Sequence, residues 1–400
     1  MNVQFYEYNT FYKTHSRIWI GMVFFCIMFM TFFQVSPQIL PNVQATLSPL
    51  IEPVIGYIGS ILFGSELENT KLLSDTKALY TFLSVLLLVS IVTALSINKK
   101  WLLKISTKSN YWLIVIFRYY LAYQLFHYGF NKLFKWQFFL PEPNTVYSEL
   151  GQITPDLLYW SAVGSSYGYT VFAGSIEIAT ALLLLFKRTY KIGALAAIVI
   201  FSNVVLVNFT FNISVKVFSS FLLVLSILLF SPSFKPLVNL LTFKAIEQPT
   251  FNKTTTNVNP WVYRATKGIV VLLFFADSLW IYGKSKNWND DQFPRISIHG
   301  AYEVITSSNT DIQRVFINRK GYLVMEDLET NRTDFQISVD TVSRVFEMHR
   351  LDSTSIWMYE WSEDKTLLLK SYKPLQYYKL RKLPYRNLPI FKDTFNWWID

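Results

Sequence analysis

The feature that most constrains this chain is the set of long apolar runs in its first 283 residues. A helix needs about 20 mostly apolar residues to cross roughly 30 Å of hydrocarbon. Seven stretches reach or approach that length: Ile18–Val35, Ala78–Ile97, Tyr111–Tyr128, Tyr169–Phe186, Ile192–Phe209, Val215–Phe230 and Val262–Tyr282. They predict a polytopic α-helical membrane protein with about seven spans.

The region around the first predicted span raises two further questions. Leu50–Phe63 is also apolar, but it is only about 14 residues long by the span criterion and contains Pro53 and two glycines. We therefore expect an interfacial or re-entrant segment there. No small-residue cleavage site follows Ile18–Val35, so we expect that run to be an uncleaved span rather than a signal peptide.

Composition and charge support a membrane protein and argue against a soluble enzyme. Hydrophobic residues make up 52% of the chain and charged residues 16%, against about 25% charged in typical soluble domains. The net charge is +10, yet Lys284–Asp400 holds 17 basic and 16 acidic residues. The excess positive charge therefore belongs to the membrane half, where it marks cytoplasmic loops, and a nucleic-acid-binding surface is not expected.

The positions of the basic residues predict an orientation. They gather before the first span and in alternate loops: Lys13, Arg17, Lys99, Lys100, Lys104, Lys108, Lys187, Arg188, Lys191, Lys235, Lys244, Lys253 and Arg264. The intervening loops are acidic or mixed, with Glu52, Glu66, Glu68 and Asp75 in the first of them. By the positive-inside rule the N-terminus is cytoplasmic and the C-terminal domain is outside, which means the inner membrane and the periplasm in a Gram-negative bacterium.

After Gly283 the pattern changes to short alternating runs that are interrupted by turn residues every 8–12 residues. This spacing predicts a small antiparallel β domain, either a barrel or a sandwich. Its aromatic side chains favour core filling, although a barrel that closes over a lipophilic ligand or caps a membrane pocket is the alternative: Trp357, Tyr359, Trp361, Tyr377 and Tyr378.

Ionisable and amide side chains inside predicted spans are costly there, so each is a candidate for function. The candidates are Arg118, His127, Lys132, Glu177, Asn203, Asn208, Lys216 and Asp277. We expect Glu177 to pair with Lys216, Lys132 or Arg118, with the asparagines bridging. Two interpretations stay open: buried pairs that hold helices together, or an outward-facing polar pocket for a quinone, a lipid head group or a small redox substrate.

Cysteine and histidine are too few for several redox and metal chemistries. Cys26 is the single cysteine, so the chain has no intramolecular disulfide, no CxxC pair and no cysteine metal cage. The histidines number four and are scattered. No metal site is expected, no catalytic residue can be assigned, and quinone is the one cofactor that the pocket interpretation would admit.

Several motifs occur in order between Phe117 and Leu241. They are Tyr128–Phe138 (YGFNKLFKWQF), Tyr167–Glu177 (YGYTVFAGSIE), and Asn203–Asn208 (NVVLVN) followed by Val215-Lys216. In this order and spacing they resemble the DoxX family of integral membrane proteins. Gly300–Val304 and Phe395–Asp400 are similar to the C-terminal β extension of its long Bacteroidota members.

The resemblance implies a four-helix membrane core formed by the third to sixth spans. Some DoxX-like proteins are linked to quinone-coupled thiosulfate oxidation or to membrane complexes that respond to oxidative stress. The matching positions, which have no agreed catalytic role in the family, are Arg118, Lys132, Glu177, Asn203, Asn208 and Lys216. Phe211–Lys216 (FNISVK) departs from the family's YDVPVK form, so Asn212 removes one acidic partner of Lys216.

These inferences divide the chain into four parts and leave two functions open. The parts are an N-terminal two-span region with its interfacial segment (1–110), a DoxX-like core (111–242), a linker with the seventh span (243–283) and a periplasmic β domain (284–400). The first function is a redox-linked, quinone-associated subunit of a membrane complex. The second is a non-enzymatic accessory, assembly or anchoring protein whose β domain binds other membrane or periplasmic proteins. We expect contact with membrane lipids and no catalytic activity of the chain on its own.

Overall fold

The fold is taken from a computed structural model. It describes residues 3–8, 16–33, 38–40, 42–64, 70–72, 74–97, 108–243, 251–256, 260–309, 311–350 and 353–392. Some residues used in the sequence analysis lie outside this described part: Lys13, Glu66, Glu68, Lys99, Lys100, Lys104, Lys244 and Phe395–Asp400.

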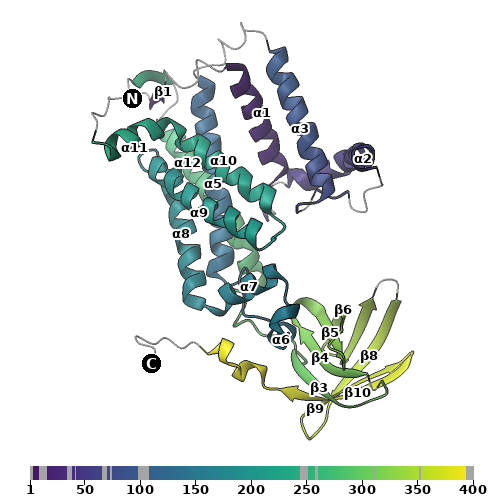
Figure 1. Ribbon diagram of the computed structural model, residues 1–400. Helices are drawn as coiled ribbons and strands as arrows, with labels where there is room; N and C mark the ends of the chain where they lie inside the picture. Colours follow the sequence, from purple (N-terminus) through teal and green to yellow (C-terminus); the bar gives the residue numbers. More distant parts are fainter. Residues whose placement is uncertain are drawn as a thin grey trace. The chain divides into compact units, whose positions relative to one another are not determined.

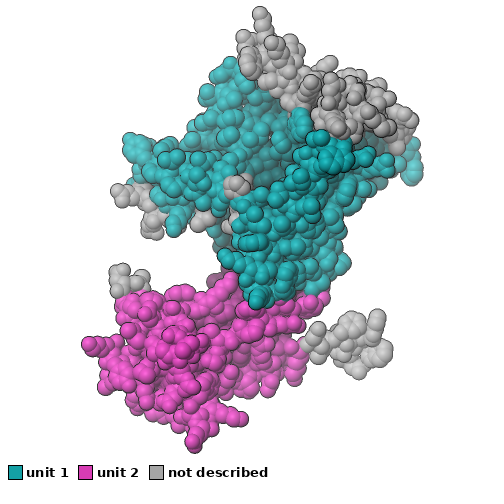
Figure 2. Space-filling view, turned by 180° about the vertical axis from the view of Figure 1, so that it is seen from behind, with its two compact units in different colours: residues 1–134, 171–288 teal, residues 135–170, 289–400 magenta. Residues whose placement is uncertain are grey.

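The chain divides into two compact units, coloured separately in Figure 2. The first, called here the helical unit, contains residues 1–134 and 171–288. The second, called the barrel unit, contains residues 135–170 and 289–400. The barrel unit therefore includes a segment, 135–170, that the sequence assigned to the membrane core.

The helical unit consists mainly of long helices, several of which lie side by side in Figure 1. They are α1 (Ser16–Phe32), α2 (Val43–Phe63), α3 (Lys77–Ser96), α5 (Lys108–Leu133), α8 (Tyr167–Leu185), α9 (Tyr190–Thr210), α10 (Lys216–Phe230), α11 (Phe234–Leu241) and α12 (Pro260–Ser285). The strands β1 (Val3–Tyr8) and β2 (Phe251–Thr256) pair antiparallel. Each of the seven runs predicted as spans is helical over most of its length.

Six described helical segments are long and apolar enough to cross a membrane: Val43–Phe63, Lys77–Ser96, Tyr167–Leu185, Tyr190–Thr210, Lys216–Leu241 and Arg264–Ser285. α1 is shorter, with an apolar segment at Arg17–Phe32. α5 has 26 residues, but polar side chains such as Arg118 and His127 lower its hydropathy, and it is not among the six. The helices are those of a multi-pass membrane protein.

The short interfacial segment predicted at Leu50–Phe63 is wrong in its length. α2 begins seven residues earlier, at Val43, and runs for 21 residues. Pro49 and Pro53 lie inside it, although proline in a sequence usually indicates that a helix is interrupted. Apolar helices tolerate proline when neighbouring groups satisfy the freed carbonyls. Asn42 caps the N-terminus by accepting a hydrogen bond from the Ala45 backbone N–H at 3.0 Å.

Glycines set the close approach of α5 to α8. A Cβ built on Gly174 would lie 2.6 Å from the Gly129 carbonyl oxygen and 3.0 Å from Cβ of Lys132. A Cβ on Gly129 would in turn lie 2.9 Å from the Gly174 carbonyl oxygen. Small residues let helix backbones approach closely inside a membrane. This contact brings Lys132 and Glu177, each three residues after one of these glycines, within reach of one another.

The barrel unit contains the predicted β domain, and it is a closed eight-stranded barrel rather than a sandwich. All neighbouring strands pair antiparallel, and β10 closes the barrel by pairing with β3. The strands are β3 (Gly300–Ser307), β4 (Ile312–Asn318), β5 (Tyr322–Asp327), β6 (Arg332–Asp340), β7 (Val345–Arg350), β8 (Ser353–Trp361), β9 (Thr366–Tyr372) and β10 (Leu375–Leu383). Residues 135–170 of this unit form the short helices α6 (Pro143–Val146) and α7 (Pro155–Ser165).

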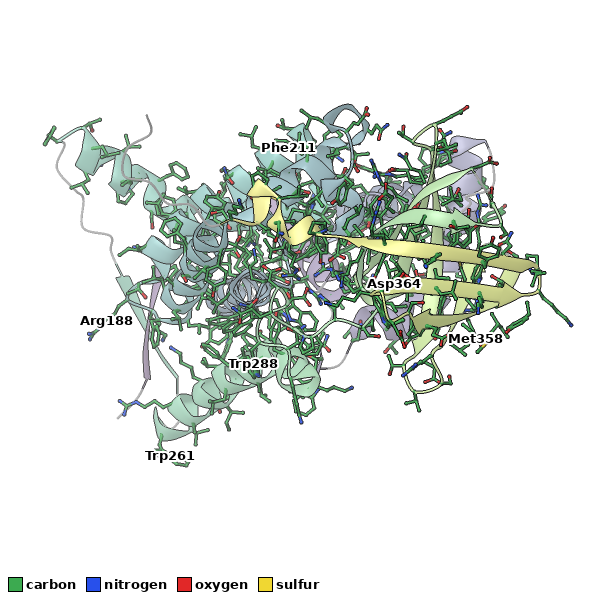
Figure 3. All side chains as sticks on the ribbon, turned by 90° about the horizontal axis from the view of Figure 1, so that it is seen from below. Arg188, Phe211, Trp261, Trp288, Met358 and Asp364 are labelled. Atoms are coloured by element: carbon green, nitrogen blue, oxygen red, sulfur yellow. The ribbon has the colours of Figure 1, made fainter. Side chains whose placement is uncertain are left out.

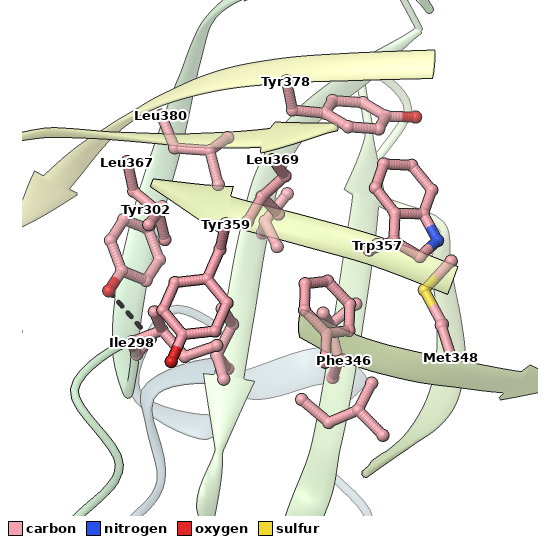
Figure 4. Packing of buried hydrophobic residues seen from close by; sticks show 14 of the residues in the cluster. Ile298, Tyr302, Phe346, Met348, Trp357, Tyr359, Leu367, Leu369, Tyr378 and Leu380 are labelled. Atoms are coloured by element: carbon pink, nitrogen blue, oxygen red, sulfur yellow. Dashed lines mark hydrogen bonds between the residues drawn. The ribbon is translucent and has the colours of Figure 1, made fainter. Parts of the chain in front are cut away.

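Side chains fill the barrel interior (Figure 4). Trp357, Tyr359 and Tyr378 are buried in this cluster, and Tyr302 donates a hydrogen bond to the Ile298 carbonyl at 2.8 Å. An eight-stranded barrel is just wide enough for its own side chains to fill it. Core filling is therefore confirmed for these three predicted aromatics. Tyr377 is partly exposed on the outer wall, and Trp361, at the end of β8, is partly exposed while its ring lies 6.4 Å from that of Tyr302.

Candidate functional site

The most connected of the predicted candidates is Asp277 on α12, which is fully buried. Its Oδ1 accepts hydrogen bonds from three consecutive backbone N–H groups, those of Gln38, Ile39 and Leu40, at 2.9, 2.5 and 2.9 Å. Its Oδ2 accepts one from the Tyr123 hydroxyl at 2.7 Å and lies 3.1 Å from Nε2 of His127. Both side chains come from α5.

These five partners satisfy both oxygens of a carboxylate that has no access to water. Hydrogen bonds from several donors are what makes a buried carboxylate tolerable. They also join three parts of the chain that are far apart in sequence: residues 38–40, α5 and α12. The ring of Tyr123 meets that of His127 edge to face, with centroids 4.5 Å apart. We call Asp277, Tyr123, His127 and the backbone of 38–40 the Asp277 network.

A second arrangement joins α5 to α8 through an ion pair. Nζ of Lys132 lies 2.9 Å from each carboxylate oxygen of Glu177, and both side chains are buried. The ammonium group also lies 5.4 Å from the centre of the Tyr128 ring. Lys132 is one of the three partners predicted for Glu177. A bidentate contact of this kind offsets part of the cost of removing both charges from water.

Lys216, also predicted as a partner of Glu177, instead meets Asp75. Asp75 accepts hydrogen bonds from the backbone N–H groups of Lys216 and Val217 at 2.8 and 3.1 Å, so it caps the N-terminus of α10. Nζ of Lys216 lies 3.8 Å from Asp75 Oδ2 and donates to Asn212 Oδ1 at 2.9 Å. Asp75 thus supplies the negative charge that Asn212 lacks.

The remaining three candidates lie in different surroundings. Asn208 is buried and donates to the Ser219 hydroxyl at 2.9 Å, which ties α9 to α10. Arg118 is buried, donates from Nε to the Leu184 carbonyl at 2.9 Å, and lies 4.7 Å from the Tyr190 ring centre. Asn203 is exposed on the surface of α9.

The structure therefore brings the predicted candidates together in smaller groups. Glu177 pairs with Lys132, as one prediction had it, while His127 and Asp277 meet in a network of their own. Lys216 and Arg118 have other partners, and the bridging role expected of the asparagines is not seen: Asn208 bonds Ser219 and Asn203 faces outward. The single cluster expected around Glu177 is wrong because Lys216 is held at the start of α10 by Asp75.

A charged network that the sequence did not indicate lies in the barrel unit. His299 Nε2 is 3.2 Å from Glu142 Oε2, which also accepts the Arg319 backbone N–H at 3.0 Å. The guanidinium group of Arg319 contacts Asp290, whose Oδ2 lies 3.1 Å from Arg295. These contacts fix the chain just before α6 to the start of the barrel.

Burial and pairing shift the pKa values of the acidic side chains of the barrel unit in opposite directions. Burial tends to raise the pKa of Glu142, but the hydrogen bonds from His299 and from the Arg319 backbone outweigh it and hold that pKa below its ordinary value. Burial raises the pKa of Asp291 despite its contacts with the Leu140 backbone and Lys135. Lys135 is fully buried, and burial lowers its pKa.

A pocket in the barrel unit borders this network. It is lined by Leu140, Pro141, Glu142, Pro143, Asp291, Arg295, His299, Tyr385, Arg386 and Phe391. Charges of both signs line it, and Glu142, Asp291 and Arg295 already contact partners in the chain. Within the described ranges, no group of three or more His, Cys, Asp or Glu side chains is arranged to hold a metal ion.

The sequence missed the residues that complete these arrangements. Asp75 was visible only as one of several acidic loop residues. Nothing in the sequence distinguishes Tyr123 from the other aromatic residues of α5. The backbone N–H groups of residues 38–40 cannot be recognised from the sequence as hydrogen-bond donors to a side chain. Glu142 and His299 are 157 positions apart, so only the fold relates them.

Comparison with known proteins gives a partial match. The uncharacterized protein YwoB of Bacillus subtilis (strain 168) is 34% identical to this chain over 122 residues, which make up 28% of this chain and 71% of YwoB. No protein-family model and no solved structure matches the chain. The name of YwoB states no activity, ligand or partner.

Proposed function

Because the chain belongs to the same protein family as YwoB, whose name states no activity, we propose its function from its own residues. The protein is a non-enzymatic accessory protein of a membrane complex. Its helices anchor it in the bilayer, and its barrel binds partner proteins. The observation that carries this proposal is that the charges buried among the helices are matched by groups of the same chain.

The pairing of those charges supports a structural role. Lys132 and Glu177 neutralise one another, and Asp277 has five partners, one of them His127. Breaking a buried pair costs about 3–5 kcal/mol, whereas replacing both members by apolar residues is often neutral. Groups that serve to hold helices together are expected to follow that rule, and groups that bind or transform a ligand are not.

The barrel supports a binding role that does not depend on a ligand inside it. Its interior is occupied by side chains, while Ile356 and Met358 lie exposed next to one another on the outer face of β8. Figure 3 labels Met358 on this outer wall. Exposed apolar side chains that neighbour one another are typical of protein–protein contact sites.

The location follows from charge. This orientation takes α2 as a helix at the membrane surface that does not cross. With α1, α3, α5, α8, α9, α10 and α12 crossing, the basic loops favour a cytoplasmic N-terminus and a barrel outside, in the periplasm if the cell has an outer membrane. The DoxX-like core corresponds to α5, α8, α9 and α10. The Lys132–Glu177 pair and the Asn208–Ser219 bond support this assignment because they join helices of that core, and Lys132, Glu177 and Asn208 belong to the shared motifs.

The Lys132–Glu177 pair provides a test of the structural role. Glu177→Leu alone or Lys132→Met alone is expected to lower the amount of folded protein in the membrane, since each leaves one buried charge unpaired. The double variant Lys132→Met/Glu177→Leu is expected to recover most of that amount and to complement a deletion strain. Immunoblotting of membrane fractions and the deletion phenotype are measured in the same strains. A double variant that is abundant but inactive would contradict the proposal.

The outer wall of β8 provides a test of partner binding. Ile356→Lys/Met358→Glu changes two exposed side chains, so the barrel is expected to stay folded while copurifying partner proteins are reduced about tenfold or more, as for hot-spot residues. Quantitative mass spectrometry of detergent-solubilised complexes measures this. The matched control is Thr354→Lys, an exposed position on the same strand, which should leave the partners in place.

A second candidate function is a redox-linked subunit associated with quinone. It is favoured by the Asp277 network, in which a histidine and a tyrosine share one buried carboxylate. Such a set of acid and base groups suits proton exchange with a quinone head group. Quinone in the lipid extract of purified protein, lost in His127→Gln at normal abundance, would favour this function over the accessory role.

A further inference from the structure

The hairpin formed by β9 and β10 ends in an exposed apolar tip. The two strands pair directly, with Tyr372 opposite Leu375 at the turn. Tyr372 is 66% exposed and Leu375 is 80% exposed, and Lys373 and Pro374 between them are exposed as well. A tyrosine and a leucine at the tip of a hairpin bury nothing of the barrel core, so packing does not explain them.

The charge of this hairpin differs from that of the rest of its unit. Residues 365–392 contain eight basic residues and no Asp or Glu: Lys365, Lys370, Lys373, Lys379, Arg381, Lys382, Arg386 and Lys392. Lys284–Asp400 as a whole has 17 basic and 16 acidic residues. Acidic partners from neighbouring segments meet some of the basic groups, as Asp364 meets Lys379 and Glu303 meets Arg381. Lys370 and Lys373, nearest the tip, are exposed.

Aromatic and aliphatic side chains beside lysines match the chemistry of a lipid head-group region. Tyrosine is enriched at membrane–water interfaces, because its ring is apolar and its hydroxyl is polar. Lysine is attracted to anionic lipids over a Debye length. Helices apolar enough to cross a membrane tether the barrel, so the barrel stays near a bilayer and a tip that reaches it needs only weak affinity.

We propose that the tip of the β9–β10 hairpin, Tyr372–Leu375, binds the surface of a bilayer that contains anionic phospholipid. Tyr372 and Leu375 enter the head-group region, and Lys370 and Lys373 contact lipid phosphates. This contact orients the barrel on the membrane and leaves the outer wall of β8 for protein partners. Binding of the tip to the bilayer does not depend on the proposed accessory function.

The test places an environment-sensitive fluorophore at the tip of the full chain. Leu375→Cys is labelled in a Cys26→Ser background, since Cys26 is the single native cysteine. The protein is reconstituted into phosphatidylcholine vesicles with or without phosphatidylglycerol, and brominated lipids report insertion by quenching. The control is Val342→Cys, 92% exposed in the turn between β6 and β7. Successive turns of this meander alternate ends, so that turn lies at the other end of the barrel.

We expect quenching and a blue shift at position 375 in vesicles with phosphatidylglycerol, and neither at position 342. Lys370→Gln/Lys373→Gln should lower the equilibrium constant for binding of the tip to the bilayer about fivefold for each lysine. Equal quenching at positions 375 and 342 would overturn the proposal. So would a blue shift at 375 that is already present in detergent and unchanged by phosphatidylglycerol, which would indicate that protein covers the tip.

Discussion

Replacing Asp277 by alanine is expected to remove most of the folded helical unit. The substitution leaves the N–H groups of residues 38–40, the Tyr123 hydroxyl and the His127 ring without their acceptor. Removal of one partner from a buried charged network costs about 3–5 kcal/mol. In apolar surroundings no water can accept hydrogen bonds from the donors that lose Asp277. The decrease in the free energy of unfolding should therefore lie at the upper end of this range.

Substitutions that remove only part of the Asp277 network should lower stability by smaller, graded amounts. Tyr123→Phe removes one donor and leaves the carboxylate its other partners, so we expect a loss of about 1 kcal/mol. Asp277→Asn keeps one acceptor oxygen but places an amide N–H₂ against donors, and its loss should be intermediate. Thermal unfolding of detergent-purified protein, followed by size-exclusion chromatography, ranks the variants. If Asp277→Ala melts at the temperature of Tyr123→Phe, the network does not hold residues 38–40 to the helices.

The helices and the β domain could be predicted because they depend on local pattern. Apolar length identifies α3 or α9, and period-two alternation identifies strands such as β8. The prediction of α2 was wrong in length because Pro53 breaks a helix in water but is tolerated in an apolar one. The sequence left barrel and sandwich open, since only the pairing of β10 with β3 distinguishes them, and the paired residues of these strands are 71 to 82 positions apart in the sequence.

The candidate site could be predicted in its residue types but less well in its pairings. Ionisable residues inside apolar runs are identified by their cost alone, and this indicated Glu177 and Asp277 correctly as buried. Their partners depend on helix packing. Glu177 meets Lys132 because Gly129 and Gly174 let α5 and α8 approach. Asp277 meets backbone groups 237 to 239 positions away, and such groups carry no sequence signal.

Replacing Trp357 by alanine is expected to have the largest effect on the barrel unit. Trp357 is 1% exposed and stacks on Phe346, with ring centroids 6.2 Å apart. Its indole N–H donates to the Ser355 hydroxyl at 2.8 Å. Truncation of a buried tryptophan costs about 3–5 kcal/mol, because the barrel wall cannot collapse into the cavity that is left.

Trp361→Ala provides the matched control. It lies on the same strand and is 37% exposed, against 1% for Trp357, so we expect a smaller loss of stability than for Trp357→Ala from its smaller buried area. Near-ultraviolet circular dichroism of the purified full chain follows the barrel during unfolding. Equal losses for the two variants would mean that the interior is not a tightly packed core. In that case a lipophilic ligand in the barrel would become the better explanation of its aromatic residues, because a binding cavity tolerates truncation that a packed core does not.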